Sequence, residues 1–171
     1  MKTLNHTQKL CLAAVLCAAA VAGSLLSFPI AGSRCAPVQH MVNILCAVLL
    51  GPGYGVGVAF AASLLRNLLS LGTPMAFPGS MFGALLCGLA YWKTKNIPLT
   101  LAAEVFGTAV LGGLCALPVA ILVMGQDAGT IAFYTYIIAF FISTAGGAVL
   151  SGIILGALSR TGVLKRLTKE G

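Results

Sequence analysis

Long stretches without any charged residue constrain the fold of this 171-residue chain more than any other feature. Charged residues make up 8% of the sequence and hydrophobic residues 59%, whereas about 25% of an average soluble domain is charged. A helix needs about 20 apolar residues to cross a bilayer, and each stretch is at least that long. This pattern predicts an integral membrane protein and excludes a soluble enzyme, a disordered tail and a nucleic-acid binder. The uncharged stretches are 10–33, 35–65, 67–92, 105–126 and 128–159.

Glycine and proline divide the longer stretches, because both residues end helices and form turns. The segment Gly51-Pro52-Gly53-Tyr54-Gly55 interrupts one stretch, and Gly72-Thr73-Pro74 lies near the start of the next. The fifth span is expected to extend past Pro118 with a bend. We predict one all-α domain over residues 1–171 with six transmembrane helices, at about 9–28, 36–50, 54–71, 79–93, 97–118 and 131–158.

The basic residues predict the orientation of these spans. Cytoplasmic loops of membrane proteins carry an excess of Lys and Arg. With six spans, both termini are cytoplasmic, and eight of the ten basic residues fall on that side. A cleavable signal peptide at the N-terminus is the alternative and would leave five spans. The eight residues are Lys2, Lys9, Lys93, Lys95, Arg160, Lys165, Arg166 and Lys169.

Motifs for catalysis and for cofactor binding are missing from the sequence. It contains no HExxH, no P-loop and no GxSxG element, which argues against a zinc enzyme, an ATPase and a serine hydrolase. Its six cysteines form no CxxC pair, so we expect them to pack as small apolar residues. The sequence therefore predicts no metal, no cofactor and no enzymatic activity.

Small residues recur every four positions on the first predicted span, at Ala14, Ala18 and Ala22. Such stripes let membrane helices approach each other closely. Two interpretations stay open: packing inside this bundle, or docking against another membrane protein. Similar repeats occur at Gly57 and Ala61, at Gly79 and Gly83, and at Ala148, Gly152 and Gly156.

Polar side chains gather near the predicted outer ends of the second and third spans. Gln39, His40 and Asn43 share one helical face, and Arg66 and Asn67 lie on the neighbouring span. Arg34 precedes the second span. Polar groups at membrane depth are costly and suggest function, so this cluster predicts a ligand site. The alternatives are that Arg66 reaches the headgroups, Arg34 is a loop residue and His40 is a structural histidine.

Glu104 is the one acidic residue within a predicted span. An ion pair with Arg66, a neutral carboxyl group and a structural hydrogen-bond partner are the alternatives for it. Aromatic side chains for stacking on a ligand are available at Phe28, Phe77, Tyr134 and Tyr136. The connections 28–36 and 72–77 are either lids or ordinary loops.

Several motifs together make the chain recognisable, most specifically between residues 32 and 83. The sequence resembles the ThiW family, the substrate-binding S components of energy-coupling-factor (ECF) vitamin transporters. The motifs are Gly32-Ser33-Arg34, Pro37-Val38-Gln39-His40-Met41-Val42-Asn43, Leu50-Gly51-Pro52-Gly53-Tyr54-Gly55, Leu65-Arg66-Asn67, Gly72-Thr73, Ala76-Phe77-Pro78-Gly79-Ser80-Met81 and Glu104 with Gly107-Thr108.

This resemblance implies a six-helix bundle in a prokaryotic cell membrane, with the ligand held near the extracellular face under the first loop. It also implies partners, because such proteins work with a transmembrane T component and two ATPases. The Ala14, Ala18 and Ala22 stripe would contact the T component. The implied ligand is hydroxyethylthiazole, a small neutral aromatic precursor of thiamine, which hydrogen bonds from Gln39, His40 or Asn43 and an aromatic ring would suit. A different small precursor and a solitary proton-coupled carrier using Glu104 or His40 are the alternatives.

Overall fold

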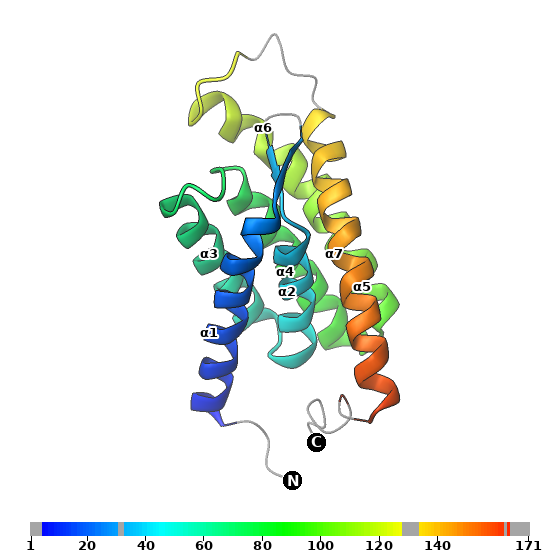
Figure 1. The fold of residues 1–171 in the computed structure, drawn as a ribbon. Helices are drawn as coiled ribbons and strands as arrows, with labels where there is room; N and C mark the ends of the chain where they lie inside the picture. The colour runs from blue at the N-terminus through cyan, green and yellow to red at the C-terminus, as the bar shows by residue number, and fades with distance from the viewer. Residues whose placement is uncertain (1–4, 31–32, 128–133, 163, 165–171) are drawn as a thin grey trace.

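The computed structural model describes residues 5–30, 33–127, 134–162 and 164, which form a bundle of roughly parallel and antiparallel helices (Figure 1). A π-helix, η2, joins α5 to α6, so the described residues contain six continuous helical segments. This confirms the all-α class. Three segments are long and apolar enough to cross a membrane: His6–Leu26, Ile97–Leu122 and Thr135–Arg160. The elements are α1 (His6–Gly23), α2 (Pro37–Leu49), α3 (Pro52–Leu68), α4 (Ala76–Thr94), α5 (Ile97–Phe106), η2 (Gly107–Gly112), α6 (Gly113–Leu122) and α7 (Thr135–Arg160).

Helix α2 is the central helix of the bundle. Nine of its thirteen residues are buried, and it packs against α1, α3, α4, α5 and α7. Its apolar residues, among them Val42, Ile44 and Cys46, are fully buried. A polar residue on α2 therefore lies in the middle of the protein, and its hydrogen bonds must come from the surrounding helices.

The break between α2 and α3 is shorter than the sequence predicts. Only Leu50 and Gly51 separate the two helices, and α3 begins at Pro52 rather than near residue 54. Gly51 adopts φ +91°, a backbone conformation open to glycine. Proline fits the first helical position because its missing N–H would have no partner there. The later glycines of this segment continue the helix.

Two other boundaries also differ from the sequence prediction. Helix α4 begins at Ala76 rather than near residue 79, because Pro78 lies in its first turn, where no intrahelical N–H bond is needed. The fifth segment continues past Pro118 to Leu122, as expected. The first segment ends early, since α1 is followed by a 3-10 turn, η1 (Ser24–Leu26). Residues 131–133 of the predicted sixth span lie outside the described residues.

A short β-hairpin, which the sequence analysis does not predict, connects η1 to α2. Strand β1 (Phe28–Ile30) pairs antiparallel with β2 (Ser33–Cys35), so that Pro29 lies opposite Arg34. Two hydrogen bonds attach its end to α7. The backbone N–H of Ala36 donates to Ser143 Oγ at 2.8 Å, and the Cys35 thiol donates to the Ala139 carbonyl at 3.2 Å. The hairpin is thus bonded to α7 and lies beside the upper ends of α2 and α7 (Figure 1).

The small-residue repeats fall into two groups according to what surrounds them. A Cβ on Gly79 would lie 2.8 Å from the Phe140 ring, and Gly112 of η2 packs directly on Gly79. That repeat therefore serves packing within the bundle. Ala14, Ala18 and Ala22 are all exposed, whereas Ala13 and Ala20 form the buried side of α1. The stripe on α1 is consequently open to a neighbour outside this chain.

Candidate functional site

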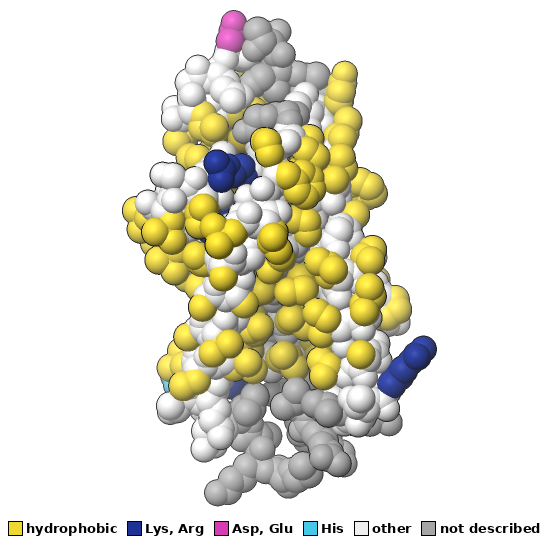
Figure 2. Space-filling view, viewed as in Figure 1, with side chains coloured by type: hydrophobic (Ala, Val, Ile, Leu, Met, Phe, Trp, Pro, Cys, Tyr) yellow, Lys and Arg dark blue, Asp and Glu magenta, His cyan; other side chains and the backbone are white. Residues whose placement is uncertain are grey.

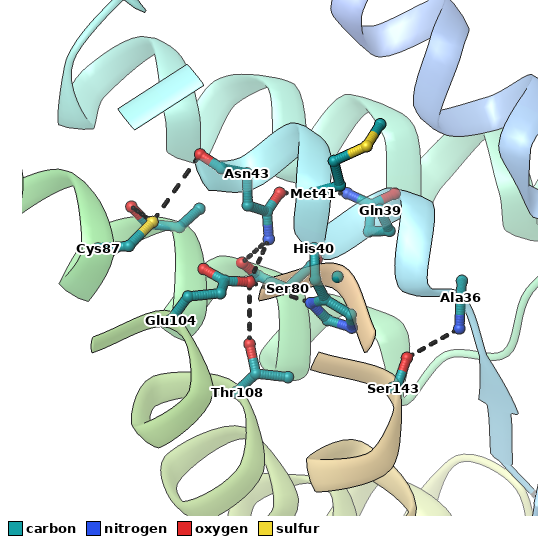
Figure 3. A network of polar contacts seen from close by, with 12 residues as sticks. Ala36, Gln39, His40, Met41, Asn43, Ser80, Cys87, Glu104, Thr108 and Ser143 are labelled. Carbon is teal, nitrogen blue, oxygen red and sulfur yellow. Dashed lines mark hydrogen bonds and ion pairs between the residues drawn. The ribbon is translucent and has the colours of Figure 1, made fainter. Parts of the chain in front are cut away.

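Glu104 lies at the centre of a buried hydrogen-bond network (Figure 3). Its side chain is 0% exposed, and three groups surround its Oε1 atom. His40 Nδ1 lies 3.0 Å away, Asn43 Nδ2 donates at 3.0 Å, and the Thr108 hydroxyl donates at 3.2 Å. Because Asn43 and Thr108 donate to Oε1 and His40 contacts the same atom through Nδ1, this single oxygen orients all three side chains. The other oxygen, Oε2, has no hydrogen-bond partner.

The local backbone explains how α4 and α5 bring Glu104 to this position. Thr108 is one helical turn beyond Glu104 and lies in η2, and π-helical turns frequently occur at functional sites. Gly83 of α4 lies opposite. A Cβ on Gly83 would collide with the Thr108 hydroxyl and lie 2.7 Å from Glu104 Oε1. The absence of a side chain at residue 83 therefore provides the space that the network occupies.

Asn43 extends the network toward α4 and α3. Besides contacting Glu104, its Nδ2 donates to the Ser80 carbonyl at 3.1 Å. The hydroxyls of Ser80 and Ser63 lie 2.8 Å apart, and Gln39 Nε2 donates to Asn43 Oδ1 at 3.4 Å. Polar groups from α2, α3, α4 and α5 thus meet around the central helix.

A small cavity of about 20 Å³ lies beside this network. Arg34, Ala36 and Phe140 also border it, so both the hairpin and α7 contribute. Glu104 is not among the residues that border the cavity; it lies behind His40 and orients the imidazole. The polar side chains that line the cavity are Gln39, His40, Arg66, Ser80, Thr108 and Ser143.

The predicted site residues therefore have different surroundings. Gln39, His40 and Arg66 line the cavity and are buried, and the exposed Arg34 lines it from the hairpin. The structure does not have the Glu104–Arg66 ion pair, because Glu104 Oε1 lies 3.0 Å from His40 Nδ1 instead. Asn67 donates to the Ser63 and Thr73 carbonyls at 2.8 and 3.1 Å, which fixes the connection after α3. Tyr134 is 53% exposed at the start of α7 and does not border the cavity.

Four residues that line the cavity are not predicted as site residues from the sequence: Ser80, Thr108, Phe140 and Ser143. Thr108 could have been found, because it follows Glu104 by one helical turn on the same face. Phe140 lines the cavity, whereas Tyr136 is buried elsewhere and donates from its hydroxyl to Gln126 Oε1 at 2.6 Å. Ser80 lies in the motif Ala76–Met81 that carries the family resemblance, whereas Ser143 carries no distinctive sequence signal.

A second, larger hollow of about 570 Å³ lies between α1 and α3, away from the polar network. Its lining is mainly apolar and includes Leu10, Ala14, Tyr54, Gly57 and Ala61. A ligand that needs specific hydrogen bonds finds few partners here. We therefore assign the candidate ligand site to the smaller cavity, where charged and hydrogen-bonding groups converge.

The apolar helices define a helical membrane protein, and its interior contains a buried polar network beside a small cavity. The surface agrees with this class, because apolar side chains cover most of the face shown in Figure 2. Residues 10–161 match the family ThiW, described as thiamine-precursor transporter protein, and the chain belongs to this family. The family resemblance seen in the sequence is thereby confirmed, and membership implies transport rather than catalysis. No curated protein and no solved structure matches the chain.

Proposed function

We propose that this protein is the S component of an ECF transporter, and that it binds hydroxyethylthiazole without chemically changing it. The observation that carries the proposal is the cavity lined by Gln39, His40 and Arg66 and bordered by the Phe140 ring. Membership of a family of thiamine-precursor transporters supports a small ligand of this kind. A hydroxyl group on the ligand would exchange hydrogen bonds with His40 or Thr108, and its aromatic ring would pack on Phe140.

Binding requires the site to widen. A cavity of about 20 Å³ has room for about one water molecule, which is far less than a substituted thiazole. The hairpin is the element whose displacement would open the cavity, because Arg34 and Ala36 border it directly. The bonds from Cys35 and Ala36 to α7 are few, so their loss is compatible with reversible opening.

Partner proteins follow from the same proposal. An S component needs a transmembrane T component and two ATPases, and the exposed Ala14, Ala18 and Ala22 stripe is a suitable contact for the T component. The hollow between α1 and α3 adjoins Ala14 and would receive apolar side chains of that partner. In this assembly the protein spans a prokaryotic plasma membrane six times, with both termini in the cytoplasm.

A binding titration of the purified protein tests the proposed ligand. We expect saturable binding of hydroxyethylthiazole and weaker binding of the pyrimidine precursor and of thiamine. His40→Ala is expected to weaken binding by about 1–3 kcal/mol, because a buried polar group of the ligand loses its partner. His6→Ala is the matched control, since His6 is exposed at the start of α1. Absence of thiazole binding would refute the proposed substrate.

Substitution on the α1 stripe tests the proposed partner. Ala18→Leu is expected to abolish co-purification with the T component, because a large side chain prevents close helix contact. Ligand affinity should stay as in the wild type, since Ala18 lies outside the cavity. Ala19→Leu is the control, because Ala19 is also exposed but lies off the stripe. Equal assembly of both variants would contradict this assignment of the interface.

A solitary proton-coupled carrier is the second candidate function, and the buried contact between His40 and Glu104 favours it. Acidic and histidine side chains at membrane depth serve as proton relays in carriers. Proteoliposomes that contain this chain alone distinguish the two functions. Thiazole uptake driven by a pH gradient would support the carrier, whereas uptake that requires the T component, the ATPases and ATP supports the S component.

A further inference from the structure

Among the described residues, no carboxylate is paired with the buried guanidinium of Arg66. Arg66 lies in the last turn of α3 and is 2% exposed. Its Nε has no hydrogen-bond partner, and the contact from Nη1 to Gln39 Oε1 is long, at 3.5 Å. An arginine side chain remains protonated in proteins, and a buried charge is costly unless it is paired. The structure thus presents a positive charge that lacks its counter-ion.

The acidic residues in the described part of the chain do not border the cavity beside Arg66. The sequence contains three: Glu104, Asp127 and Glu170. Glu104 Oε1 lies 3.0 Å from His40 Nδ1 and already accepts hydrogen bonds from Asn43 and Thr108. Asp127 is exposed after α6 and does not border the cavity, and Glu170 lies outside the described residues. Within the described part of the chain, the positive charge of Arg66 is therefore uncompensated.

A second guanidinium borders the same cavity. Arg34 is the exposed residue of strand β2 and lines the cavity together with Arg66. Figure 2 shows basic side-chain surface at the level of the hairpin, above the apolar middle of the protein. Two like charges that face one small cavity repel each other, and an anion placed between them would remove this repulsion.

We propose that Arg34 and Arg66 bind an oxyanion, a phosphate ester or a carboxylate, carried by the thiazole that enters the cavity. This inference rests on the proposed function and specifies the chemical class of the ligand. Guanidinium groups match both oxyanions because they present parallel N–H donors to two oxygens. A neutral alcohol would leave both positive charges without a counter-ion, whereas a charged thiazole uses the hydrogen-bonding side chains and the arginine pair together.

The test compares four probes on the purified full chain in detergent: hydroxyethylthiazole, its phosphate monoester, a thiazole carboxylate of the same size and inorganic phosphate. We expect at least one charged thiazole to bind about tenfold or more tighter than the alcohol, which is about 1.4 kcal/mol. Arg34→Gln and Arg66→Gln should lower the ratio of the affinity for the charged thiazole to the affinity for the alcohol toward one. Arg66→Lys should lower it less, and Arg160→Gln, at the far end of α7, should leave it unchanged.

Other results separate this inference from the proposed function. If the alcohol binds at least as tightly as both charged thiazoles, the arginine pair is not an anion site, although the proposed function stands. If Arg66→Gln fails to fold, Arg34→Gln is the deciding variant because Arg34 is exposed. An unchanged ratio of charged-thiazole to alcohol affinity in that variant overturns the inference. If no thiazole binds, the proposed function fails. Binding of inorganic phosphate that is lost in Arg34→Gln would then still support an anion site. Absence of phosphate binding as well would refute the anion site.

Discussion

Glu104 determines the geometry of the site although it does not line the cavity. One oxygen of this residue accepts hydrogen bonds from Asn43 and Thr108 and contacts His40. These three side chains come from α2 and η2. Orientation of the imidazole by a buried carboxylate leaves its other nitrogen available for the cavity. Glu104 is therefore a positioning residue, and its removal should affect both the stability of the bundle and the binding of a ligand.

Replacement of Glu104 tests this role. Glu104→Ala is expected to lower the free energy of unfolding by about 3–5 kcal/mol, because it breaks a buried pair and leaves polar partners without an acceptor. Glu104→Gln should cost less, since its amide oxygen still accepts a hydrogen bond. Unfolding in detergent measures both variants. Equal losses would show that the carboxylate is not the common acceptor, and no loss would contradict its central position.

Some of this site could be predicted from the sequence at the level of single residues. The spacing of Gln39, His40 and Asn43 placed them on one helical face, and the burial of Gln39 and Asn43 agrees with that face. The partner of Glu104 could not be predicted, because it depends on which helix lies between α5 and α3. Since α2 is central, His40 reaches Glu104 and Arg66 does not.

At the scale of elements, the hairpin borders the cavity through Arg34 and Ala36, and the proposed function requires it to open. Cys35 is 1% exposed, and its thiol donates to the Ala139 carbonyl. Burial raises the pKa of this thiol above its ordinary value of 9.0. Because the thiolate is the reactive form, Cys35 should react slowly with thiol reagents for as long as the hairpin stays attached to α7.

The rate of Cys35 modification therefore reports hairpin opening. In a variant that retains only this cysteine, the rate should still rise with pH above pH 9, where an ordinary thiol is already half ionised. Ser143→Ala should increase the rate, because the Ala36 N–H loses its acceptor. Thr161→Ala, at the other end of α7, should not change it. Fast modification of the folded wild-type position would contradict a closed hairpin.

The contact between α4 and η2 depends on glycines, which let the two helices approach closely. Gly83→Ala should destabilise the protein by about 1–3 kcal/mol, because the added methyl group overlaps Thr108 and crowds Glu104. Gly156→Ala on α7 is the matched control, since nothing lies within 4 Å of its added Cβ. That control should be neutral or stabilising by up to about 1 kcal/mol. Equal effects in unfolding measurements would refute the packing argument.

The elements themselves were largely predictable, because charge-free stretches and breakers mark helices clearly. Six helical segments were expected and are present among the described residues. The hairpin was not predicted, because its strands have three residues each and carry no alternation of apolar and polar residues long enough to detect. The early starts of α3 and α4 were missed because proline was treated as a breaker, although it is tolerated in a first helical turn.

At the scale of the whole molecule, the two ends of the bundle differ in charge. The start of α1 and the end of α7 lie at the same end of Figure 1, and six alternating segments place the end of α4 there as well. Lys9, Lys93, Lys95 and Arg160 belong to that end, whereas Arg34 and Arg66 border the cavity toward the other. Since Lys and Arg are enriched on the cytoplasmic side, the candidate cavity should open toward the outside of the cell.

Labelling of intact cells tests this orientation. In a variant without native cysteines, Asp127→Cys should react with a membrane-impermeant maleimide, because residue 127 is exposed after α6, which lies at the end of the bundle opposite the C-terminal end of α7 (Figure 1). Arg160→Cys should react only after the cells are permeabilised, and the cysteine-free chain controls for background. The reverse result would place the cavity toward the cytoplasm and contradict uptake through it. Reaction of both positions in intact cells would mean an even number of membrane crossings between them, which would refute the six-span topology.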